Sequence, residues 1–124
     1  MRRRSLTTLL AFTLIAPGCG REPPDPAVLM EADRAFAADV AGAGADAWAT
    51  WFATDGAMIQ AGTGEIRGRQ AIRDAVAYLD QPGLTLTWEP ARADIAASGD
   101  LGWTTGTYVF RTAPDAPPDR GRYV

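Results

Sequence analysis

Residues 84–112, LTLTWEPARADIAASGDLGWTTGTYVFRT, decide the fold. Apolar residues occupy the even positions from Leu84 to Trp88 and the odd positions from Ala91 to Ile95. Alternation with period two is typical of a strand with one buried face, and a switch of parity needs one extra residue. We therefore predict a long antiparallel hairpin that bends at a β-bulge near Glu89-Pro90 and turns at Ser98-Gly99-Asp100.

Three helices are predicted ahead of this hairpin. The first begins at Asp25-Pro26, where a capping residue precedes a proline, and the second begins at Asp46. The third runs from about Arg69 to Asp80 and is stopped by Pro82-Gly83. The residues expected to face the core recur at helical spacing. They are Leu29, Ala32, Phe36 and Val40, then Trp48, Trp51 and Phe52, then Ile72, Val76 and Leu79.

Shorter elements fill the rest of the chain. Ala57 to Gln60 is a candidate strand, and Gly62-Thr63-Gly64 predicts a hairpin turn rather than a phosphate-binding loop, because a third glycine is missing. Gly121 to Val124 has the pattern of a strand that has only begun. The predicted fold class is α+β, with three N-terminal helices packed on a strongly bent antiparallel sheet. The domain is expected to span residues 27–124 and to be truncated at its C-terminal strands.

The composition excludes several kinds of chemistry. All 12 basic residues are arginine, and histidine is absent. Without histidine or lysine, the chain has no Ser-His-Asp triad, no histidine metal site and no Schiff-base lysine, and we expect neither a metal nor a cofactor. The formal net charge of −3 gives no reason to expect a nucleic-acid partner.

The first 26 residues are predicted to be a leader and a tether. Arg2 to Arg4 precede an apolar run from Leu6 to Ala16, which is too short to span a bilayer, and then Gly18-Cys19. This arrangement resembles a bacterial lipoprotein signal peptide over residues 1–19, in which Cys19 is lipidated; the alternative is an ordinary secretory signal with an incidental cysteine. Residues 20–26 hold three prolines and predict an extended tether. The expected location is the bacterial cell envelope, with membrane attachment through the lipid, or alternatively the periplasm or the medium.

Several short motifs in a fixed order carry a family resemblance. In chain order they are Trp48 and Phe52 before Asp55-Gly56, Gly68 with Ala71-Ile72, Gly106-Thr107-Tyr108, and Gly121-Arg122-Tyr123-Val124. With these motifs the chain resembles, from about Ala27 to Val124, the nuclear-transport-factor and ketosteroid-isomerase cone superfamily. The nearest branch is that of its uncharacterised bacterial members, near the SnoaL-like polyketide cyclases. The resemblance implies a pocket between the concave face of the sheet and the helices, and often a homodimer.

The same resemblance argues against isomerase activity. The isomerase members need a carboxylate base at the end of the first strand, and that position falls on Gln60, whose amide cannot accept a substrate proton at neutral pH. The tyrosine that stabilises the oxyanion falls on Phe36, and the second donor would lie beyond Val124 or be missing. No catalytic residue is therefore assigned, and Asp55 before Gly56 is interpreted as a turn.

The resemblance implies a ligand pocket lined by Gln60, Met58, Trp88, Trp103 and Tyr108. The expected ligand is a small hydrophobic or amphipathic molecule. The leading hypothesis is an envelope-anchored module that binds a small molecule or a partner and is not catalytic. The alternative is a small-molecule isomerase, cyclase or hydrolase of the same superfamily that uses an Asp or Tyr in the pocket.

Overall fold

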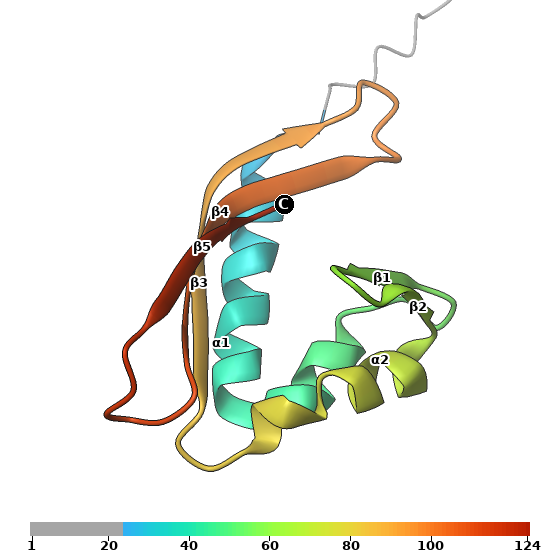
Figure 1. Ribbon diagram of the computed structural model, residues 1–124. Coiled ribbons are helices and arrows are strands. Elements are labelled where there is room, and N and C mark those ends of the chain that lie inside the picture. The colour runs from blue at the N-terminus through green and yellow to red at the C-terminus, as the bar shows by residue number, and fades with distance from the viewer. Residues whose placement is uncertain (1–23) are drawn as a thin grey trace, which may run out of the picture.

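The computed structural model describes residues 24–124 (Figure 1). The helices are α1 (Ala27–Thr50), α2 (Arg69–Ala75) and the 3₁₀-helix η1 (Ala77–Asp80). The strands are β1 (Ala57–Gln60), β2 (Gly64–Arg67), β3 (Thr85–Ile95), β4 (Gly102–Arg111) and β5 (Asp119–Tyr123). The helices pack on antiparallel sheets, so the α+β class is confirmed. The predicted signal peptide, Cys19 and residues 20–23 of the tether lie outside the described residues.

β3, β4 and β5 form an antiparallel sheet with β4 in the middle. The register of β3 against β4 shifts between Pro90 and Arg92. Ala91 is the extra residue, because Pro90 is buried, Ala91 is exposed, and the inward positions resume at Ala93. The predicted bulge is thus confirmed. Beyond it the hairpin curves over one end of α1 (Figure 1).

The described residues contain two α-helices, so the prediction of three is wrong. The first two predicted helices form one element, α1, with a kink at Gly44, where φ is 56° and ψ is −132°. The helix resumes directly because the carboxylate of Asp80 accepts the freed N–H of Ala45 at 2.9 Å. Asp46, the predicted cap, instead pairs with Arg73 at 2.9 Å. The third predicted helix is present as α2 followed by η1.

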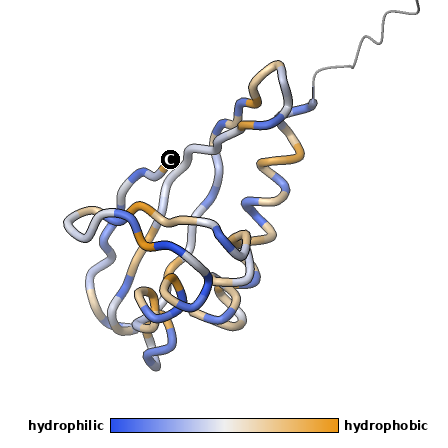
Figure 2. Tube along the Cα trace, turned by 90° about the vertical axis from the view of Figure 1, so that its right-hand side faces the viewer, coloured by the Kyte–Doolittle hydropathy of each residue, from blue (hydrophilic) through white to orange (hydrophobic). Residues whose placement is uncertain are grey.

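The core lies where α1 meets α2, η1 and the sheet. Its buried residues are Val40, Ala45, Ala47, Ala49, Ile72, Val76 and Leu79. The ring of Phe36 extends this core, with its centroid 5.0 Å from those of Trp48 and Trp88. Trp51 was predicted to be buried but is 40% exposed. It follows the last turn of α1, stacks on Phe36 and donates its indole N–H to Asp39 at 3.0 Å. Polar and apolar residues alternate along α1 in Figure 2.

The β1–β2 hairpin lies apart from the larger sheet. β1 pairs with β2 from Ala57 opposite Arg67 to Gln60 opposite Gly64, which confirms the predicted strand and turn. In Figure 1, α1 runs along the sheet, and the β1–β2 hairpin lies across from the sheet, above α2. Of the helices in residues 24–124, none combines the length and the hydropathy needed to cross a bilayer.

Candidate functional site

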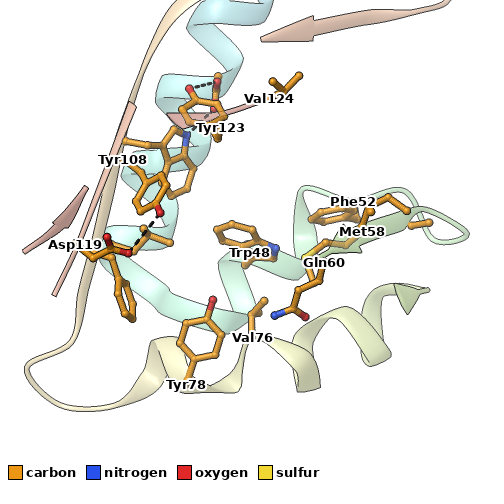
Figure 3. Close-up of a pocket in the computed structure, with 16 residues that line it drawn as sticks. Trp48, Phe52, Met58, Gln60, Val76, Tyr78, Tyr108, Asp119, Tyr123 and Val124 are labelled. Atoms are coloured by element: carbon orange, nitrogen blue, oxygen red, sulfur yellow. Dashed lines mark hydrogen bonds between the residues drawn. The ribbon is translucent and has the colours of Figure 1, made fainter. Parts of the chain in front are cut away.

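A cavity of about 770 Å³ lies between the sheet, α1 and the β1–β2 hairpin. Figure 3 shows Tyr108, Asp119 and Tyr123 on the sheet side and Met58 and Gln60 on the hairpin side. Seven aromatic side chains line it, namely Trp48, Phe52, Tyr78, Trp88, Tyr108, Phe110 and Tyr123. The volume is in the range of about 300–1,000 Å³ that is typical of small-molecule sites, which are also mostly apolar with a few polar groups.

Four of the five residues predicted for the pocket line this cavity together: Gln60, Met58, Trp88 and Tyr108. Trp103 does not line this cavity. It lines a smaller cavity of about 270 Å³ with Leu29 and Phe36, and the guanidinium of Arg92 lies 5.4 Å from its ring centroid. The reason is the alternation of β4, which sends the odd-numbered Trp103 and the even-numbered Tyr108 to opposite faces of the strand.

The polar centre of the cavity is Asp33, a half-buried residue of α1. The indole N–H of Trp88 donates to Oδ1 of Asp33 at 2.6 Å. The phenol of Tyr123 donates to Oδ2 at 2.7 Å. Three elements, α1, β3 and β5, therefore meet at one carboxylate, and both donors are neutral groups.

Asp33 was not predicted as a site residue, although the sequence contains a signal for it. Asp33 lies four residues after Leu29 and three before Phe36, so it shares the face of α1 on which we predicted the apolar stripe. A carboxylate on a buried helix face is costly unless hydrogen bonds satisfy it. Such a residue is therefore a candidate for a site.

Two cross-strand pairs place the tyrosines of the cavity. Gly106 of β4 faces Tyr123 of β5, and Tyr108 of β4 faces Gly121 of β5. A Cβ on Gly106 would lie 2.8 Å from the ring and hydroxyl of Tyr123, and one on Gly121 would lie 2.5 to 2.6 Å from the ring and hydroxyl of Tyr108. Each ring thus lies directly on a glycine of the neighbouring strand. The hydroxyl of Thr105 fixes the end of β5 by donating to the backbone oxygen of Tyr123 at 2.7 Å.

The environment of Tyr123 keeps its phenol protonated. Burial raises the pKa of Tyr123, and the hydrogen bond to Asp33 and the negative charges of Asp33 and Glu89 raise it further, against a smaller opposing effect of Arg34. Burial also raises the pKa of Tyr78. At neutral pH Tyr123 is therefore a hydrogen-bond donor to Asp33 and offers only oxygen lone pairs to a ligand.

Two polar groups that line the cavity, the amide of Gln60 and the indole N–H of Trp48, have no side-chain hydrogen bond among residues 24–124. Among residues 24–124, the half-buried amide of Gln60 takes part in no side-chain hydrogen bond. The indole N–H of Trp48 is buried and has no acceptor within the same part of the chain. Phe36, which the resemblance places at the oxyanion position, packs between tryptophans and does not line the cavity.

Comparison with models of known protein families found no match to this chain. A comparison with curated proteins found none either. Within residues 24–124, no group of three or more Asp, Glu, Cys or His side chains is arranged to hold a metal ion.

Proposed function

We propose that residues 27–124 form a module that binds a small amphipathic molecule. The observation that carries this proposal is the cavity of about 770 Å³, whose lining is largely aromatic and has polar groups at two ends. Asp33 and Tyr123 supply one polar end, and the amide of Gln60, which is unpaired within residues 24–124, supplies the other. An apolar body with polar substituents fits such a distribution.

The finer assignments belong to the same proposal. A cone of the nuclear-transport-factor and ketosteroid-isomerase type is supported by the bulge in β3, by the position of α1 along the sheet and by the cavity beside it. Anchoring in the bacterial envelope is supported by the leader that ends at Cys19. Labelled palmitate in growing cells tests the anchor. Label on the full chain but not on Cys19→Ser is expected, and equal label on both contradicts it.

A neutral solvatochromic dye, N-phenyl-1-naphthylamine, tests the binding function on the full chain. Gln60→Trp fills the cavity without removing a hydrogen bond within the described chain, and we expect it to weaken dye binding at least about 10-fold, since each 1.4 kcal/mol of lost contact is a factor of ten. Leu101→Trp is the matched control, because Leu101 is 69% exposed and lies outside the cavity. Equal dye binding by both variants, or none by the unaltered protein, contradicts the proposal.

A second candidate function is catalysis by an Asp or Tyr of the cavity, as in an isomerase, cyclase or hydrolase. The observation that favours it is the contact of a carboxylate with a phenol inside an aromatic cavity. It ranks second because both oxygens of Asp33 already accept hydrogen bonds and the raised pKa of Tyr123 makes it a weak acid. Turnover of a simple enone above buffer that disappears in Asp33→Asn, with dye binding kept, would reverse this order.

A further inference from the structure

The charges of the cavity are all of one sign. Its lining contains two carboxylates, Asp33 and Asp119, and none of the arginines of residues 24–124. The ion pairs within that range use Glu65, Glu89, Asp46, Asp80 and Asp94 as their anions. Neither carboxylate of the cavity is therefore neutralised by a cation of the described chain.

The arginine nearest in sequence to Asp33 is engaged elsewhere. Arg34 lies beside it in α1, but its guanidinium contacts Glu89 of β3 at 2.7 Å. The groups that do contact Asp33, the indole of Trp88 and the phenol of Tyr123, carry no charge, so they hold the carboxylate in place without cancelling its charge. Each carboxylate oxygen has a second lone pair and can accept one more hydrogen bond.

Asp119 extends this negative region along β5. The phenol of Tyr108 lies 3.4 Å from its Oδ2, at the limit of a hydrogen bond. Figure 3 shows Tyr108 between Asp119 and Tyr123, so tyrosine rings lie next to both carboxylates. The faces of Tyr and Trp rings attract cations through their quadrupole, and aromatic rings combined with carboxylates recognise alkylammonium groups.

We propose that the ligand of this cavity is an organic cation, with a positively charged nitrogen on an apolar body. This inference rests on the proposed binding function and names its substrate class. The nitrogen lies at the sheet side, near Asp33 and Asp119, and the apolar body lies against the aromatic residues that continue towards the hairpin. An anion of the same shape is disfavoured, because it would face two carboxylates in a site partly shielded from water.

Three probes of one shape and different charge test this inference on the full chain. They are benzyltrimethylammonium, its neutral carbon isostere neopentylbenzene, and the anion benzylsulfonate, each used to displace N-phenyl-1-naphthylamine. We expect the cation to bind roughly 10-fold more tightly than the neutral isostere, as cation–π and carboxylate contacts of moderate strength imply, and the anion to bind most weakly. The preference for the cation should weaken as salt concentration rises.

Two variants assign the preference to the carboxylates. Asp33→Asn and Asp119→Asn should each reduce the cation-to-isostere ratio roughly twofold to fivefold, the range expected for loss of a solvent-exposed ion pair. Asp115→Asn, an exposed position of the loop before β5 outside the cavity, should leave it unchanged. Because Asp119 is exposed, its variant is expected to fold even if Asp33→Asn does not.

The outcomes separate the two proposals. Equal binding of the cation and its isostere, tighter binding of the sulfonate, or the same ratio in Asp119→Asn and Asp115→Asn would overturn the cation assignment and leave the binding module standing. Failure of the unaltered protein to bind the dye would overturn the binding function, and the cation assignment with it.

Discussion

The contact between Tyr108 and Gly121 provides the sharpest test of how the cavity is built. Gly121 has no positive φ, so an alanine there is free of backbone strain, and its effect must come from the new methyl group. That methyl group would lie 2.5 to 2.6 Å from atoms of the Tyr108 ring, where about 3.4 to 4 Å is ordinary contact. The ring must therefore move by roughly 1 Å or the strands must separate.

We expect Gly121→Ala to lower the free energy of unfolding by about 1–3 kcal/mol, the usual cost of overpacking. Urea denaturation followed by fluorescence measures it. Because the displaced ring lines the cavity, binding of N-phenyl-1-naphthylamine should weaken as well. Gly42→Ala is the matched control, since no heavy atom lies within 4 Å of the added methyl group. Gly42 lies in α1, so this change should instead stabilise the protein by about 0.4–1 kcal/mol.

A double-mutant cycle assigns the cost to the ring. In the Tyr108→Ala background the methyl group on residue 121 has room, so the loss caused by Gly121→Ala should shrink by at least about 1 kcal/mol. An unchanged loss in that background would refute the reasoning, and so would a Gly121→Ala protein as stable as the parent.

Three further predictions concern Asp33 and the kink in α1. Tyr123→Phe should lower the free energy of unfolding by about 1.5–3 kcal/mol, because it removes a hydrogen-bond donor to a carboxylate. An unchanged free energy of unfolding in urea denaturation would contradict this. Because the pKa of Tyr123 is raised in the folded protein, the unfolded chain releases above pH 10 a proton that the folded protein keeps. The free energy of unfolding should therefore fall from pH 10 to pH 12, and it should fall less in Tyr123→Phe. Gly44→Ala should lower the free energy of unfolding by about 1–3 kcal/mol, since φ of Gly44 is positive and the added methyl group would meet the carboxylate of Asp80. A melting temperature at or above that of Gly42→Ala would contradict this.

The elements that the sequence predicts correctly are those that depend on a pattern of neighbouring residues. The parity switch in β3 is visible in about ten residues, and the bulge lies where the switch requires it. The number of helices depended on a distant contact. Gly44 marks a break, but the helix resumes directly because Asp80, 35 residues away, accepts the N–H of Ala45. Spacing along α1 does not contain that information.

The residues of the site divide in the same way. Gln60, Met58, Trp88 and Tyr108 line one cavity. Trp103 lines the smaller cavity instead, because odd and even positions of a strand point to opposite faces. Asp33 and Tyr123 were missed as a pair because their contact joins residues 90 positions apart.

The hydrogen bonds of Asp33 also link formation of the cavity to the docking of β3 and β5 on α1. A carboxylate on the inner face of α1 is stabilised only once its hydrogen-bond donors contact it. These donors come from β3, 55 residues later in the chain, and from β5, 90 residues later. Until β5 docks, one oxygen of Asp33 lacks its phenol donor and Tyr108 lacks the glycine surface on which its ring lies. The charged end of the cavity therefore forms together with β5. A cation bound beside Asp33 would stabilise the docked strand by mass action, so ligand binding and protection of the β5 amides from hydrogen exchange should rise together.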